Sequence, residues 1–210
     1  MQAFGLRSDS FSGHNPTATV VARPLTHNEQ PAISRLALRA ATDEIHQRMH
    51  QHPGLARLAA GTIGRDEYCR LLARSYGFYV VVEPIAGLSG RLTESLVRDL
   101  ADLGLTAAAV SGLPRCMSLK ISDGHPEMIG ARYVLLGASL GGKVMAKAVA
   151  RQNGGTALPT QFLNGSGDND WKGFVAQLEA ALPDVASRSR AAVAANATFA
   201  AYEEWMSCNE

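Results

Sequence analysis

The stretch Arg132–Lys147, RYVLLGASLGGKVMAK, is apolar enough to form a buried helix, yet it carries three glycines in its middle. Each glycine inside a helix costs about 1 kcal/mol relative to alanine. Tyr133, Gly137 and Gly141 recur every four residues and Met145 continues the series, so these residues share one helix face. The bare middle of that face admits a second helix or a flat ligand, and spacing alone favours helix packing.

Apolar residues at helical spacing predict further helices on both sides of this stretch. The predicted helices cover residues 34–51, 64–92, 94–103, 126–153, 171–182 and 186–206, with 108–125 and 158–171 as connections. Pro53 and Gly54 are expected to end the first helix, and Pro84 to kink or break the second. No longer run alternates like a β-strand. The chain is therefore predicted to be an all-α, single-domain bundle over residues 31–210, after a flexible N-terminal leader over residues 1–30.

Composition limits the classes of protein that fit. The chain has 210 residues, of which 46% are hydrophobic and 19% charged, enough to bury a core as one domain. Its net charge of +1 gives no reason to expect a nucleic-acid partner. No apolar run reaches the roughly 20 residues that span a bilayer, so no membrane partner is expected. The cysteines Cys69, Cys116 and Cys208 form no paired pattern, which favours a reduced, cytoplasmic protein.

Two histidines, His46 and His50, lie four residues apart and share a helix face. This spacing is similar to that of the zinc motif His-Glu-x-x-His, but Gln47 stands where that motif has its general-base glutamate. A zinc hydrolase is therefore disfavoured. A helical histidine with no other signal is more often structural or exposed than a metal ligand.

Arg39 lies seven residues before His46, which is two helical turns, or about 10 Å, along the same face. That separation suits a ligand with a metal centre and a distant carboxylate, which is the shape of haem. The alternative is a solvated arginine on an amphipathic helix.

Two segments resemble the haem oxygenase family. LRAATDEIHQRM, residues 38–49, resembles the proximal helix of these enzymes, in which the iron-binding histidine follows an Ala-Thr pair, four residues after the threonine. Thr42 and His46 have this spacing. YVLLGASLGGKVM, residues 133–145, resembles the glycine-rich distal helix, whose two glycines, four apart, lie over the haem.

Two more segments extend the resemblance. DEYCRLLARSYGFYVVVEP, residues 66–84, and ATFAAYEEWM, residues 197–206, are similar to the second and C-terminal helices of the family. The resemblance covers roughly residues 34–206 in order. It is closer to the bacterial branch, including enzymes encoded beside bacteriophytochromes.

The resemblance implies a haem oxygenase-like bundle that holds haem b, as substrate and cofactor, between a proximal helix and a kinked distal helix. Haem would be degraded with O2 and external electrons to biliverdin, carbon monoxide and ferrous iron. His46 is then the iron ligand. The implied haem-binding residues are Arg39, Thr42, Tyr133, Gly142, Phe199 and Tyr202, with Arg39 and Tyr133 at the propionates. The implied catalytic residues are Gly137, Ser139 and Gly141, because a bulky side chain over the haem would keep oxygen from a meso carbon.

The chain departs from the family pattern at three positions. Ala138 follows the first distal glycine, where animal enzymes have a water-organising aspartate, and Ser139 is the nearest polar substitute. Leu136 replaces a glutamate that is common in phytochrome-linked relatives. His50 stands where animal enzymes have a glutamate near the proximal histidine.

These departures leave two alternatives to a haem oxygenase. One is a haem-binding or carrier protein on the same fold with little turnover. The other is a di-metal oxidase, with ligands drawn from Asp43, Glu44, His46, Glu83 and Glu127. Glu44 and His46, only two residues apart, do not form the Glu-x-x-His pair of such sites. For a haem oxygenase the partners would be a ferredoxin or reductase, because no flavin or nicotinamide motif is present, and a bacteriophytochrome.

Overall fold

The computed structural model describes residues 33–151, 157–165 and 168–208, and the predicted leader over residues 1–30 lies outside these ranges. The described residues form helices and no strand, which confirms the all-α prediction. The helices are α1 (Ile33–His50), α2 (Pro53–Ala60), α3 (Arg65–Ile85), α4 (Arg91–Asp102), α5 (Ala107–Ser111), α6 (His125–Ala150), α7 (Gln161–Asn164), α8 (Asp168–Ala181) and α9 (Val185–Ser207).

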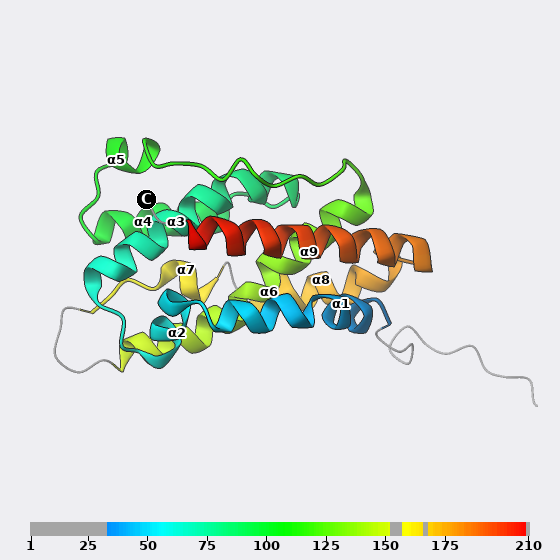
Figure 1. Cartoon of the computed structure of the whole chain (residues 1–210), viewed down its shortest axis with the longest axis horizontal. Helices are drawn as coiled ribbons and strands as arrows, with labels where there is room; N and C mark the ends of the chain where they lie inside the picture. The colour runs from blue at the N-terminus through cyan, green and yellow to red at the C-terminus, as the bar shows by residue number, and fades with distance from the viewer. Residues whose placement is uncertain (1–32, 152–156, 166–167, 209–210) are drawn as a thin grey trace, which may run out of the picture. The chain divides into compact units, whose positions relative to one another are not determined.

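The helices α1, α6 and α9 form the centre of the bundle. In Figure 1, α1 in blue and α9 in red run side by side across the molecule, and α6 passes behind them. At Gly130, α6 comes so close to α9 that an added Cβ would lie 2.2 Å from the carbonyl oxygen of Ala191. Ala194 and Ala195 are also buried along α9. Small residues on both helices therefore let their backbones come close.

Several helix ends follow from local sequence. Pro84 lies in the last turn of α3, so the helix ends one residue later rather than kinking in its middle. The neighbouring Glu83 is 1% exposed and its carboxylate accepts from the backbone N–H groups of Leu92 and Thr93, which begin α4. A buried acid thus caps the N-terminus of the following helix.

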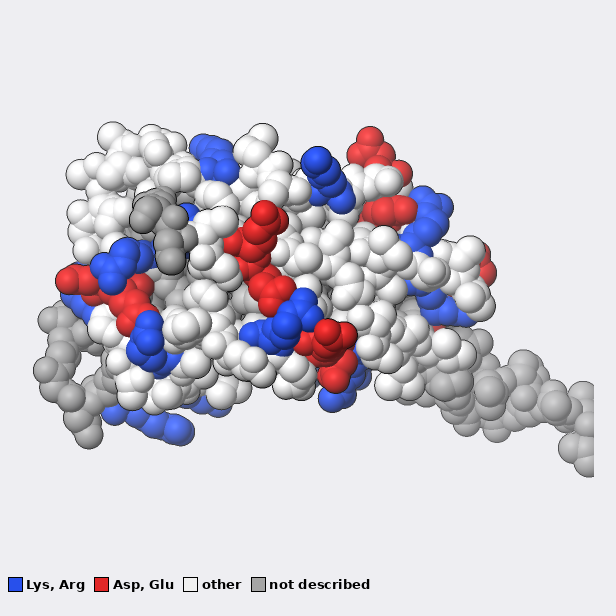
Figure 2. Space-filling model, viewed as in Figure 1, with Lys and Arg blue, Asp and Glu red and all other residues white. Residues whose placement is uncertain are grey.

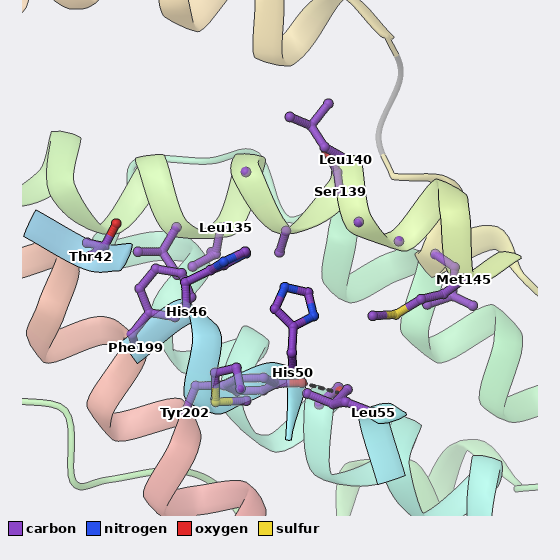
Figure 3. A pocket seen from close by; sticks show the side chains of 18 of the residues that line it. Thr42, His46, His50, Leu55, Leu135, Ser139, Leu140, Met145, Phe199 and Tyr202 are labelled. Carbon is purple, nitrogen blue, oxygen red and sulfur yellow. Dashed lines mark hydrogen bonds between the residues drawn. The ribbon is translucent and has the colours of Figure 1, made fainter. Parts of the chain in front are cut away.

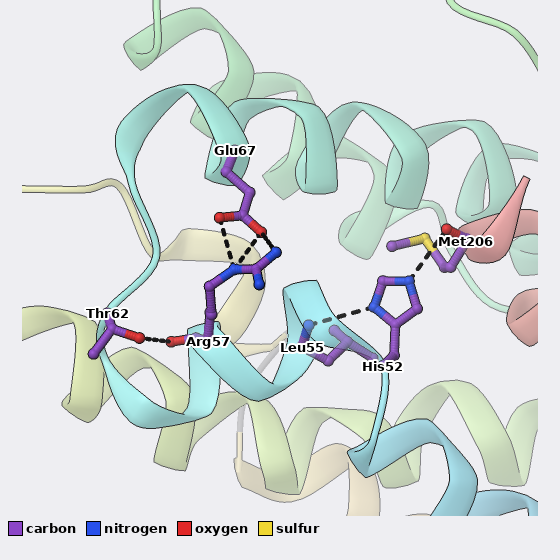
Figure 4. A network of polar contacts seen from close by, with 6 residues as sticks. All are labelled: His52, Leu55, Arg57, Thr62, Glu67 and Met206. Atoms are coloured by element: carbon purple, nitrogen blue, oxygen red, sulfur yellow. Dashed lines mark hydrogen bonds and ion pairs between the residues drawn. The ribbon is translucent and has the colours of Figure 1, made fainter. Parts of the chain in front are cut away.

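Three short helices lie where the sequence predicted none: α2, α5 in the connection predicted over 108–125, and α7 in the connection predicted over 158–171. Pro53 and Gly54 do follow the end of α1, but they also begin α2, since proline is favoured in the first turn of a helix. Figure 4 shows the His52 ring capping α2: its Nδ1 accepts from Leu55 N–H at 3.4 Å, and its Nε2 lies 3.2 Å from the Met206 carbonyl oxygen. The connection predicted over 158–171 contains α7 and the start of α8.

The glycine-bearing helix α6 runs unbroken through Gly137, Gly141 and Gly142, and its predicted kink stays a prediction. By length and composition it is the single helix of the described ranges that could cross a membrane. Its apolar character has another explanation in the bundle. One side packs against α9, and another lines the cavity described below.

Candidate functional site

A cavity of about 600 Å³ lies between α1 and α6 and is closed by residues of α2, α3, α4, α7, α8 and α9. Pockets that hold ligands typically measure roughly 300–1,000 Å³. The ten residues that the sequence singled out for the site all line it: Arg39, Thr42, His46, Tyr133, Gly137, Ser139, Gly141, Gly142, Phe199 and Tyr202. The fold therefore brings residues as far apart in the chain as Arg39 and Tyr202 to one cavity. Their individual roles stay predictions.

Two histidine rings project from α1 into this cavity. Figure 3 shows His46 and His50 pointing from α1 toward α6. Their ring centroids are 4.7 Å apart in an edge-to-face arrangement, and the Phe199 ring is 6.0 Å from His46 on its other side. One turn before His46, the hydroxyl of Thr42 donates to the Leu38 carbonyl at 2.8 Å, so it is used within α1. The His46 imidazole is therefore held in place by its contacts with the His50 and Phe199 rings.

Burial lowers the pKa of His46 below its ordinary value of 6.5. The positive charges of His50 and Arg39 act in the same direction, while the Asp43 carboxylate opposes them. At neutral pH the neutral imidazole therefore predominates. Neutral imidazole is the form that binds a metal.

The wall opposite the histidines is bare helix backbone. A Cβ added to Gly141 would meet no atom within 4 Å, and one added to Gly137 would meet the Trp171 ring at 3.6 Å. A Cβ at Gly142 would instead lie 2.4 Å from the carbonyl oxygen of Leu163 in α7. Gly141 of the predicted stripe therefore faces open space and Gly137 borders the Trp171 ring, whereas Gly142 beside them is a packing contact. Of the two explanations for the stripe, the geometry favours room for a ligand.

The polar groups on this wall are few. Ala138 is exposed to the cavity, and the hydroxyl of Ser139 donates to the Leu136 carbonyl at 2.6 Å. The proton of that hydroxyl is thus used within α6, and only its lone pairs remain to accept from a water. Gly165, after α7, approaches so closely that its Cβ would lie 2.8 Å from the Cβ of Ser139.

One end of the cavity is positively charged. Arg35 and Arg39, one turn apart on α1, line it together with Tyr133 of α6. Burial raises the pKa of the Tyr133 hydroxyl, while the hydroxyl of Thr42 and the charges of both arginines lower it. Within the described ranges neither arginine has an ion-pair partner. This end is suited to hold the acidic edge of a ligand.

The rest of the cavity is apolar, with lining residues such as Leu58, Leu71, Leu92 and Phe162. The Tyr202 hydroxyl lies 3.2 Å from the Ser75 hydroxyl, which itself donates to the Leu71 carbonyl. Burial raises the pKa of Tyr202, so the phenol stays protonated. Its role at this wall is that of a fixed, neutral ring.

Sequence reasoning missed other lining residues, among them Arg35, Trp171 and Ser75. Arg35 had a usable signal, because it precedes Arg39 by one helical turn and so shares its face. Trp171 and Ser75 had none, since only the packing of α8 and α3 brings them to the cavity.

The structure gives no support to the di-metal alternative. Among the described residues there is no group of three or more His, Cys, Asp or Glu side chains placed to hold a metal. Three of its four proposed carboxylates have other partners: Glu83 caps α4, Glu127 pairs with Arg190 at 2.7 Å, and Glu44 pairs with Arg48 at 3.1 Å.

This helical protein therefore has an apolar cavity with an imidazole on one wall, bare backbone on the other and cations at one end, an arrangement that suits a flat molecule with an acidic edge. A model of the Heme oxygenase family matches residues 34–208. The chain belongs to this family, and membership supports a role in haem degradation.

Comparison of structures agrees on the fold. Heme oxygenase-1 from the cyanobacterium Synechocystis sp. PCC6803, whose crystal structure is in complex with heme, superposes with a TM-score of 0.58. The match covers 84% of this chain and 91% of the cyanobacterial one, at 18% sequence identity. Among curated protein sequences none matches the chain.

Proposed function

We propose that this protein is a haem oxygenase that degrades haem b to biliverdin, carbon monoxide and ferrous iron, with O2 and electrons from outside the chain. The observation that carries the proposal is the pairing of His46 with the bare backbone at Gly137 and Gly141 across one cavity. Family membership and the haem in the cyanobacterial relative support it.

The residues around the cavity fit haem in three ways. The neutral imidazole of His46 offers a nitrogen to the iron. Arg35 and Arg39 offer cationic donors to the propionates. Gly137 and Gly141 add no side chain to the facing wall, so they would leave room there for O2 and water beside a bound haem. Bound haem supplies the redox-active iron, and the chain supplies orientation and access.

The partners follow from the same proposal. The electrons come from a ferredoxin or a reductase, and the products serve either a bacteriophytochrome, with biliverdin as chromophore, or iron acquisition. In Figure 2 acidic and basic side chains are interspersed over the face that is seen, and the whole chain has a net charge of +1. That pattern does not favour nucleic acid. We place the activity in the cytoplasm, where the thiols of Cys69, Cys116 and Cys208 stay reduced.

The test is a haem titration followed by turnover. The purified chain should bind one haem with the Soret band of a histidine-ligated complex. Added ascorbate and air should then convert it to a pigment that chromatography identifies as biliverdin. His46→Ala should lose that Soret band and the turnover. If the variant kept the wild-type spectrum and rate, the proposal would be wrong.

A haem carrier on the same fold is the second candidate, and the Ser139 hydrogen bond favours it. Because that hydroxyl donates to Leu136 and Ala138 has no polar group, little side-chain polarity remains to hold water over the haem. A carrier would bind haem tightly and form no biliverdin. Turnover before and after Ala138→Asp separates the two candidates. A carrier forms no biliverdin until this substitution gives it slow turnover, whereas an oxygenase forms biliverdin as wild type and only its rate changes.

A further inference from the structure

The proposed function uses His46 but leaves His50 without a role. His50 is exposed, lines the cavity, and in the described part of the chain has no hydrogen-bond or ion-pair partner. His52, two residues later, differs in both respects, since both nitrogens of its ring are within hydrogen-bonding distance of backbone groups. His50 therefore has nitrogens free for a ligand.

The geometry of the two cavity histidines suits a shared metal ion. Residues four apart on a helix face the same way, and the His46 and His50 ring centroids are 4.7 Å apart. Two imidazole nitrogens that bind one zinc-type ion at about 2.0–2.1 Å lie no more than about 4.2 Å apart. Small rotations of the two rings would bring one nitrogen of His46 and one of His50 within that distance. Both rings are exposed in the cavity, so rotation breaks no hydrogen bond.

We propose that, in the haem-free protein, His46 and His50 together bind a divalent transition-metal ion of the zinc, nickel or copper type. Imidazole is a good ligand for these ions. The described residues offer no third protein ligand, so water fills the remaining positions and the affinity is moderate. This is a site for free ions, distinct from the single-nitrogen bond to haem iron.

The metal and haem exclude each other. Both need the His46 nitrogen, and a flat ligand over His46 occupies the space into which His50 points (Figure 3). The free ion therefore slows haem uptake, and haem releases the ion. The binding of the ion does not depend on the proposed function, whereas the exclusion rests on it.

The experiment titrates the full-length, haem-free protein with Zn²⁺ by calorimetry in a non-chelating buffer. Wild type should bind one Zn²⁺ at this pair. His50→Gln and His46→Gln should each weaken that binding by about tenfold or more, the equivalent of about 1.4 kcal/mol. His125→Gln, at an exposed position where α6 begins, and His14→Gln with His27→Gln, outside the described residues, should leave it unchanged.

Haem uptake separates this proposal from the proposed function. His50→Gln should still bind haem with the wild-type Soret band, and saturating Zn²⁺ should slow haem uptake by wild type but not by His50→Gln. Equal Zn²⁺ affinity of wild type and both cavity variants would overturn the metal site, while haem binding could stand. Zn²⁺ binding lost in the variants, in a protein that takes up no haem, would support the metal site and contradict the proposed function.

Discussion

Gly141 and Gly142 are neighbours in the chain, but a methyl group added to each meets different surroundings. At Gly141 it meets no atom within 4 Å, so Gly141→Ala should raise the free energy of unfolding by about 1 kcal/mol through helix propensity. At Gly142 it would lie 2.4 Å from the Leu163 carbonyl oxygen, so Gly142→Ala should lower it by about 1–3 kcal/mol. Urea unfolding of the haem-free variants measures both. The prediction fails if the two variants are equally stable.

The arginines at the charged end of the cavity should contribute to haem affinity. A hydrogen bond to a charged group is worth about 1.5–3 kcal/mol, so Arg39→Gln or Arg35→Gln should weaken haem binding about tenfold or more. Arg48→Gln is the matched control, because Arg48 lies on the same helix but pairs with Glu203 and does not line the cavity. Haem titrations give the affinities. Haem with esterified propionates should bind all variants alike, and a loss that persisted with the ester would contradict the propionate contact.

For single residues, the sequence predicted which glycines share the face that lines the cavity, but not what each glycine contacts. Spacing showed that Gly137 and Gly141 share a face, and the resemblance placed that face over a ligand. Spacing could not show that Gly142 is a packing contact, because that depends on Leu163 in α7, which only the folded chain brings close.

Among the elements, α7 is short but holds the distal helix. The Asp99 carboxylate, 0% exposed in α4, accepts from the N–H groups of Gln161 and Phe162 at 3.0 and 2.9 Å. The next residue, Leu163, contacts Gly142 of α6. A four-residue helix has no stability of its own. Asp99 therefore fixes α7, and α7 in turn supports the cavity wall.

Asp99→Ala should release this support. Two partly buried N–H groups lose their acceptor, at a cost of up to about 1–3 kcal/mol each, unless α7 opens to water. Hydrogen exchange followed by mass spectrometry should speed up at 158–165 and at the facing part of α6. Asp102→Ala, an exposed acid at the end of the same α4, is the control and should leave exchange there unchanged. Equal protection in both variants would show that α7 is held by other contacts.

The helices that sequence predicted are those with long apolar periodicity, such as α6 and α9. The helices it missed, α2, α5 and α7, are short and depend on caps. α2 is capped by His52, an unusual capping residue, and the N-terminus of α7 is capped by Asp99, a residue far away in the sequence. No local sequence pattern predicts the cap that Asp99 provides for α7.

For the whole molecule, the lowered pKa of His46 implies a pH-dependent stability. The unfolded chain binds this proton with the ordinary pKa of 6.5, and the folded chain more weakly. The contribution of His46 to the free energy of unfolding is therefore fully present above pH 6.5 and is lost as the pH drops toward the folded-state pKa. His46→Gln removes this loss, so the stability of the variant relative to wild type should rise as the pH is lowered from about 8 to about 5. Thermal melting at each pH measures it, and a constant difference would contradict the shift.

Ligand binding should stabilise the whole bundle, since the cavity borders most of its helices. At a free haem concentration of about 100 times Kd, binding adds about 2.7 kcal/mol to the free energy of unfolding. For a domain of this size, that corresponds to a rise in Tm of roughly 5–10 °C. His46→Gln should show a smaller rise at the same haem concentration, because it loses the bond to iron. Arg48→Gln should show the full rise, because it lies outside the cavity. An equal rise in all three proteins would mean that haem binds elsewhere on the chain.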